Sequence, residues 1–207
     1  MENIFRSEMK IFEKIEALKV QYGNDSLLRK NGTLLLGIGT IPKARHTLYK
    51  GLDDIVIKKY LIDQYKLPFP KSYANFLNHF NGASLYNIRT IISGVKCVKT
   101  NLSIYGLPLT PPQSRAPDME EPYDVRIESL GQHKDLPDRW LKIGRYTTGY
   151  DFKVLCEIFV DTGDGCVYGV KKKTDIIVDK WNNLDDCLCA IFDSFSDLKE
   201  EYIYSKD

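Results

Sequence analysis

The chain has 207 residues and an almost balanced charge, with 29 lysines and arginines against 28 aspartates and glutamates. This balance speaks against nucleic-acid or membrane-surface binding by the chain as a whole. Hydrophobic residues make up 43% of the sequence, enough to bury a core, which excludes wholesale disorder. No apolar run approaches the roughly 18 residues of a membrane-spanning helix. The N-terminus lacks the pattern of a secretory signal, so we expect a cytoplasmic protein.

The cysteines and histidines do not indicate a metal site. The five cysteines include no Cys-x-x-Cys pair, and the three histidines are scattered. A zinc site needs about four ligands at short, paired spacings. We therefore expect reduced thiols in the core, and neither a metal nor another cofactor.

The first half of the chain predicts mainly helices. Apolar residues recur at helical spacing over residues 3–20, and a second helix is expected over 53–65. Between them, the run LLLGIGT at residues 34–40 has two glycines. It lacks the third glycine, the Gly-Lys-Ser/Thr and the following helix of a phosphate loop, so a strand or turn is favoured.

The clearest local signal is LPFPKSYANFLNHFNG at residues 67–82. Pro70 suits the first turn of a helix, where its missing N–H costs no hydrogen bond. An apolar face follows at positions i, i+3, i+4 and i+7, made of Tyr73, Phe76, Leu77 and Phe80. The pair Asn81-Gly82 predicts the end of this helix.

Short β-rich runs follow at residues 85–107 and 139–181, and a closing helix is expected over 184–202. Between the two groups of strands, residues 108–138 form a proline-rich, acidic excursion. Helices, then strands, then a helix predict an α+β fold in a single domain. We expect a mostly antiparallel or mixed sheet of about five to six strands, with helices packed mainly on one face.

The motif Asp161-Thr162-Gly163 raises the question of catalysis. An apolar pair followed by Asp-Thr-Gly carries the catalytic aspartate of retropepsin-like aspartic proteases. The supporting Ile-Gly-Arg segment of such proteases follows the aspartate, whereas Lys142–Arg145 precedes it here. Asp and Gly are also favoured in turns. We favour a turn, in which Asn would replace Asp161 at little cost, and keep the protease as a remote alternative.

Four segments in order resemble the SUKH superfamily, which includes cell-wall assembly regulators of the Smi/Knr type. They are residues 67–82, the IYGL of Ile104–Leu107, Leu141–Tyr150, and Asp161 with GCVYGV and a C-terminal FDSF. The match implies a SUKH-like domain at 46–207, with 1–45 as an N-terminal extension holding a helix and a strand or turn. In that family the aspartate opens a turn. One departure is Tyr150, which stands where the family has an aspartate.

The resemblance implies a non-enzymatic binding protein. Bacterial SUKH proteins are mostly immunity proteins that neutralise a cognate polymorphic toxin, often a nuclease, by direct contact in the cytoplasm. Others are regulatory scaffolds, which remains the alternative. The sequence offers no paired nucleophile and base, so no catalytic residue is expected. The expected partner is a protein toxin, without direct nucleic-acid or membrane contact, and the expected state is a monomer or weak homodimer.

Charge is unevenly distributed along the chain. Residues 118–138 hold seven acidic side chains (Asp118, Glu120, Glu121, Asp124, Glu128, Asp135 and Asp138) against Arg126 and Lys134. Ordinary solvated surface is one interpretation, and an acidic patch for a basic partner is the other. The predicted partner-binding residues are Asp118, Glu120, Glu121, Tyr123 and Asp124 in the excursion, with Tyr150 and Asp164 on turns at the sheet edge.

Overall fold

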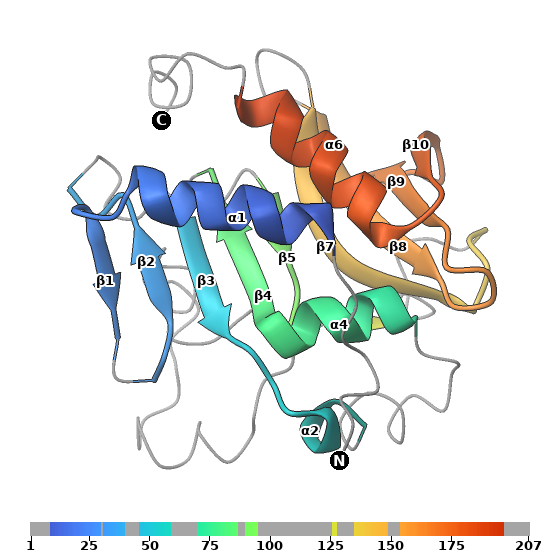
Figure 1. Cartoon of the computed structure of the whole chain (residues 1–207). Helices are drawn as coiled ribbons and strands as arrows, with labels where there is room; N and C mark the ends of the chain where they lie inside the picture. Colours follow the sequence, from blue (N-terminus) through green and yellow to red (C-terminus); the bar gives the residue numbers. More distant parts are fainter. Residues whose placement is uncertain are drawn as a thin grey trace, which may run out of the picture.

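The computed structural model describes residues 9–29, 31–39, 46–58, 70–86, 90–94, 126–127, 135–148 and 154–196. Within these residues, ten strands form one sheet (Figure 1) in the order β1-β2-β3-β4-β5-β7-β8-β9-β10, with β6 paired to β7. The strands are β1 (Ser26–Leu28), β2 (Leu34–Leu36), β3 (His46–Lys50), β4 (Phe80–Leu85), β5 (Thr90–Ile92), β6 (Arg126–Ile127), β7 (Trp140–Thr148), β8 (Val154–Asp161), β9 (Val167–Lys171) and β10 (Ile177–Trp181).

The predicted fold class is wrong in its sheet, which is larger than the expected five to six strands. Every pairing between the described strands is antiparallel. Strands β1 and β2 are only three residues long, too short for an alternating pattern to stand out. They come from residues 1–45, which were expected to form an extension, and they continue the same sheet through β3.

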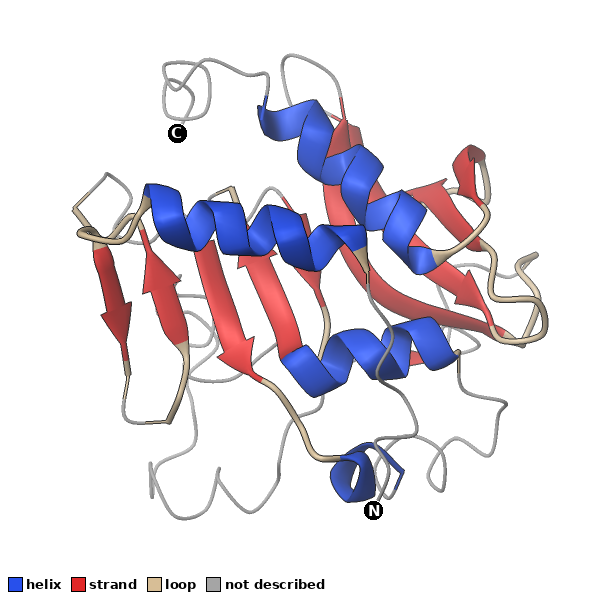
Figure 2. Ribbon diagram, in the orientation of Figure 1, coloured by secondary structure: helices blue, strands red, loops and turns tan. Residues whose placement is uncertain are grey.

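The described helices are α1 (Lys10–Gln21), α2 (Asp54–Ile57), α4 (Lys71–His79) and α6 (Leu184–Ser196). Figure 2 shows α1, α4 and α6 against the same face of the sheet. The main core lies between them and the strands, and its largest fully buried side chains include Tyr73, Phe76, Phe195, Ile11 and Ile15. None of the described helices is long and apolar enough to cross a membrane.

Helix α4 leads directly into a strand. It begins after Pro70 and ends at His79, and Phe80 already belongs to β4. Gly82 has a φ of 88°, a left-handed conformation that glycine adopts without a steric cost. Phe80, which was predicted on the apolar face of the helix, lies in β4, so the helix ends two residues before the predicted Asn81-Gly82 stop. Its glycine lies inside the next strand, so helix α4 and β4 meet without a loop.

A second, small core lies on the opposite face of the sheet. Val160 belongs to the main core, and its neighbour Phe159 points the other way because side chains alternate along a strand. Phe159 packs with Trp140 and Val170, and the rings of Trp140 and Tyr168 stack at 4.1 Å. This cluster stiffens the end of the sheet where β7, β8 and β9 meet.

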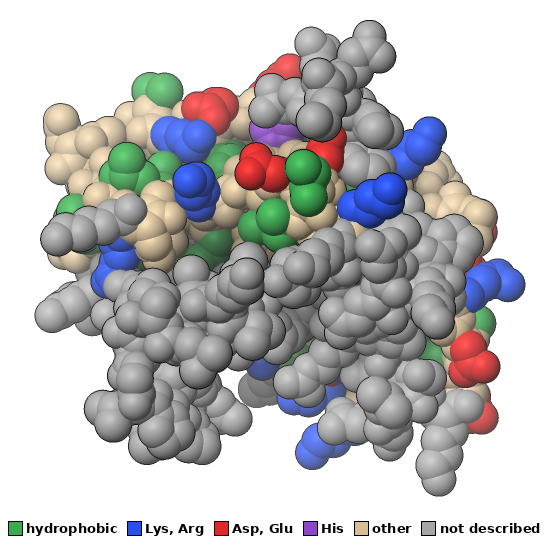
Figure 3. All heavy atoms as spheres, turned by 90° about the horizontal axis from the view of Figure 1, so that it is seen from below, with side chains coloured by type: hydrophobic (Ala, Val, Ile, Leu, Met, Phe, Trp, Pro, Cys, Tyr) green, Lys and Arg blue, Asp and Glu red, His purple; other side chains and the backbone are tan. Residues whose placement is uncertain are grey.

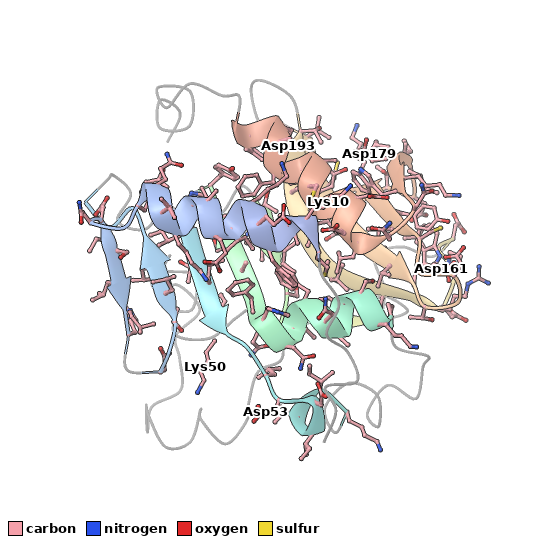
Figure 4. All side chains as sticks on the ribbon, in the orientation of Figure 1. Lys10, Lys50, Asp53, Asp161, Asp179 and Asp193 are labelled. Carbon is pink, nitrogen blue, oxygen red and sulfur yellow. The ribbon has the colours of Figure 1, made fainter. Side chains whose placement is uncertain are left out.

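Helix α1 is bound to helix α6. The Asp185 carboxylate at the start of α6 accepts hydrogen bonds from the backbone N–H groups of Lys10 and Ile11, both at 3.0 Å. These N–H groups in the first turn have no partner within their own helix. Further along, Lys14 Nζ lies 2.6 Å from Asp193 Oδ1. The two contacts fix both ends of the chain's described part to one another (Figure 4).

Candidate functional site

The Asp161 carboxylate lies at the end of β8 and accepts hydrogen bonds from four N–H donors (Figure 4). Arg139 donates from Nε to Oδ1 at 2.7 Å and from Nη2 to Oδ2 at 2.8 Å. The indole Nε1 of Trp140 donates to Oδ2 at 3.1 Å, and the backbone N–H of Gly163 donates to Oδ1 at 2.8 Å. The Arg139 hydrogen bonds, with those from Gly163 and Trp140, lower the pKa of Asp161 against the opposing effect of burial.

The backbone around Asp161 forms a tight turn. Its N–H donates to the Cys166 carbonyl at 2.8 Å, and its own carbonyl accepts from the Gly165 N–H at 2.8 Å. Gly165 has a φ of 78°, which favours glycine. A catalytic aspartate of the protease type shares a proton with a second carboxylate. Asp161 instead accepts hydrogen bonds from Arg139, from the Trp140 indole on β7 and from the Gly163 N–H of its own turn, so this geometry gives the protease alternative no support.

Of the predicted partner-binding residues, Asp164 is described. Its side chain is exposed, and its Oδ1 accepts a hydrogen bond from the Cys166 N–H at 2.8 Å. It therefore helps to form the β8–β9 turn while facing solvent. The other predicted residues lie outside the described residues. They are Asp118, Glu120, Glu121, Tyr123, Asp124 and Tyr150.

Sequence reasoning missed the β9–β10 hairpin as a candidate site. Strand β10 ends the sheet and pairs with β9. In the connecting turn, Lys171 N–H donates to the Ile176 carbonyl at 3.0 Å, and Thr174 Oγ1 donates to the Lys171 carbonyl at 2.9 Å. Three consecutive apolar residues follow. Their side chains are exposed by 57% at Ile176, 49% at Ile177 and 43% at Val178. We call these three residues the β10 patch.

Exposed lysines lie on the same hairpin as the β10 patch. Lys171 and Lys173 are exposed at the hairpin turn, with Lys172 half-buried between them. Lys180 is also exposed, and its Nζ lies 5.5 Å from the centre of the Tyr168 ring. In contrast, basic, acidic and apolar side chains are interspersed among the described residues on the face shown in Figure 3. The hairpin therefore combines an apolar strip with one sign of exposed charge.

The hairpin is fixed to the rest of the sheet through Tyr146. The Tyr146 hydroxyl on β7 donates to the Asp179 carboxylate on β10, and its ring packs edge-on against Trp181 at 6.0 Å. The Tyr146 side chain passes over Gly169, where an added Cβ atom would lie 2.1 Å from the Tyr146 hydroxyl oxygen. Burial is the main reason that the pKa of Tyr146 is raised. A larger residue at position 169 would therefore clash with the Tyr146 hydroxyl that joins β7 to β10.

A second candidate is a small pocket between α1 and α6. Its volume is about 200 Å³, and its lining includes Lys14, Tyr22, His46, Tyr86 and Phe192. The His46 and Tyr86 rings meet edge to face at 4.8 Å. Pockets for drug-sized ligands usually enclose about 300–1,000 Å³, so this pocket is smaller than that range.

The described residues offer no cluster for metal or thiol chemistry. No group of three or more histidine, cysteine, aspartate or glutamate side chains is placed to hold a metal ion in this part of the chain. Cys156, Cys166, Cys187 and Cys189 are free thiols. Burial raises the pKa of Cys187 well above its usual value, which disfavours the reactive thiolate.

No family model matches the chain, and no curated protein matches it either. The resemblance to the SUKH superfamily accordingly stays a prediction.

Proposed function

We propose that this chain is a non-enzymatic protein-binding protein of the immunity type, which neutralises a cognate toxin by direct contact in the cytoplasm. The observation that carries the binding role is the β10 patch, in which Ile176 at the end of the hairpin turn and Ile177 and Val178 at the start of β10 are all exposed. Contiguous apolar surface on an ordered protein marks contact sites for other molecules. A protein partner removes such surface from water.

The buried polar groups support a binding role over a catalytic one. Asp161 is occupied by Arg139 and its own turn, and Glu157 is paired with Lys142 at 2.5 Å. These contacts join neighbouring strands and turns of the sheet and occupy both carboxylates. The toxin as the class of partner rests on the SUKH resemblance.

The proposal is tested with the product of the neighbouring gene. Purified wild-type chain is titrated with that product in a catalytically inactive form, and cells expressing the active form are scored for growth with and without this chain. We expect one-to-one binding and restored growth, with a toxin of another family as the negative control. Growth arrest that persists despite expression of the folded chain would overturn the toxin role. Binding to a neighbour that is not toxic would favour the regulatory scaffold.

The acidic excursion supplies a second arm of the same test. Replacing Glu120, Glu121 and Asp124 by Lys should slow association with a basic partner, and the loss should shrink as salt rises. Tyr123→Ala should weaken binding by about 1–3 kcal/mol if this ring is an interface anchor. Unchanged association in the triple variant would exclude the excursion from the interface.

A further inference from the structure

The β10 patch departs from the usual pattern of an edge strand. Side chains alternate between the two faces of a regular strand, so its first two residues, Ile177 and Val178, are not expected to be exposed to a similar extent. The register of β10 against β9 shifts between Ile177 and Asp179. Such a bulge re-aims side chains locally. It accounts for the joint exposure of Ile177 and Val178, and Ile176 in the preceding turn extends the apolar strip.

Within the hairpin of residues 171–181, which the structure describes in full, the exposed charged side chains are lysines. Lys171, Lys173 and Lys180 are exposed. Of the two neighbouring acids, Asp179 accepts the Tyr146 hydrogen bond and Asp175 is half-buried. A typical protein interface has an apolar centre and a polar rim. The hairpin has this arrangement, with lysines as its rim.

We propose that the β10 patch is the apolar anchor of the partner interface, and that the partner presents there an apolar surface with an acidic rim. This inference rests on the proposed function, because the partner is the cognate toxin. It adds a prediction about where that toxin is held. Clefts that bind nucleic acid are basic, and a lysine rim would be repelled from them. On a nuclease toxin, this contact therefore lies outside the phosphate-binding cleft.

Charge also argues against a second copy of this chain as the occupant. In a two-fold contact, the same patch on both copies meets itself. The lysine rims of two hairpins would then face one another, and like charges in contact oppose association. An acidic rim on a different protein removes this repulsion.

The apolar part is tested with Ile177→Ser/Val178→Ser and a matched control, Leu27→Ser/Leu28→Ser. The control residues lie on β1 at the opposite edge of the sheet and are exposed by 47% and 69%. The probe is the inactivated product of the neighbouring toxin gene, measured by biolayer interferometry. We expect the patch variant to raise the Kd by about tenfold or more and the control by less than about threefold. Thermal unfolding of both variants checks that the fold is kept.

The rim is tested with Lys171→Glu/Lys173→Glu. This variant should slow association at low salt, and the difference from wild type should shrink at high salt because ions screen exposed charges. Lys58→Glu/Lys71→Glu is the matched control, since both lysines are exposed near α2 and α4. A faster association of the Lys171→Glu/Lys173→Glu variant would overturn the acidic rim.

The outcomes separate this inference from the proposed function. If the wild-type chain does not bind the toxin, the proposed function fails and the assignment of the patch to a toxin fails with it. If wild type binds and the serine variant at residues 177 and 178 binds equally well, the function stands and the patch assignment fails. Two further results would overturn the patch assignment, because each would show that something other than the toxin binds the patch. They are a wild-type dimer that this variant dissociates, and binding to phosphatidylserine vesicles that this variant abolishes.

Discussion

Replacing Asp161 by Asn tests whether this residue needs its charge or only its shape. As a turn former alone, Asp161 would tolerate Asn. The structure predicts a cost, because its two oxygens accept four N–H donors from Arg139, Trp140 and Gly163. Asn keeps one oxygen, which can still accept from the Gly163 N–H. The NH₂ group of Asn then takes the place of Oδ2 and faces the N–H groups of Arg139 and Trp140, which are also donors, so no hydrogen bond forms there.

The size of the effect follows from what each donor loses. Trp140 is buried, and an unsatisfied buried donor costs about 1–3 kcal/mol. Arg139 is 60% exposed, so its guanidinium can turn to water and its loss is minor. Asp161→Asn should therefore lower the free energy of unfolding by about 2 kcal/mol. Asp164→Asn is the control and should change it by less than about 0.5 kcal/mol, because Asn also forms this kind of turn.

Urea unfolding at pH 7, followed by tryptophan fluorescence, measures both variants. The pKa of Asp161 is lowered in the folded state from its usual 3.8. Its ionised form therefore stabilises the fold above pH 3.8, and this contribution is lost as the pH falls below that value. The difference between wild type and Asp161→Asn should shrink over the same range. Equal stabilities of Asp161→Asn and Asp164→Asn at pH 7 would refute the reasoning.

Three further predictions concern the sheet and its thiols. Gly169→Ala should cost about 2 kcal/mol in urea unfolding, because its Cβ would lie 2.1 Å from the Tyr146 hydroxyl. Tyr146→Phe should recover part of this loss in the double variant, whereas strict additivity would contradict the contact. Lys142→Met should lower the free energy of unfolding by about 2 kcal/mol, because it removes the lysine that pairs with the buried Glu157 carboxylate. Urea unfolding measures this change. Cys187 should react with a thiol reagent only when urea unfolds the chain, since burial raises its pKa.

Local pattern was sufficient to predict the helices that build the core. The spacing of Tyr73, Phe76 and Leu77 predicts a buried face, and all three are buried in α4. The closing helix expected over 184–202 is α6 as far as Ser196, and its Leu184, Leu188, Ile191 and Phe195 are buried. Helical periodicity depends on neighbours a few positions apart, so it can be read directly from the sequence.

The β10 patch could not be predicted in this way. A run such as Ile176, Ile177 and Val178 is typical of a buried strand, and the sequence alone gives no strand order. Its exposure depends on β10 ending the sheet and on the register shift against β9. Both are properties of pairings between distant segments. The same limit applies to Asp161, whose arginine partner lies 22 positions earlier in the chain.

The final prediction concerns residues 1–22, which include α1 and belong to the segment expected as an extension. Ile11, Ile15 and Leu18 of this helix are buried in the main core. Burying such a side chain contributes about 1.5–3 kcal/mol, so the three together contribute about 4.5–9 kcal/mol before the ordering cost of the helix. Total stabilities are about 5–15 kcal/mol. A chain lacking residues 1–22 should therefore lose its near-ultraviolet circular dichroism and bind a hydrophobic dye. Cooperative unfolding at the wild-type urea midpoint would instead show that α1 is a dispensable appendage.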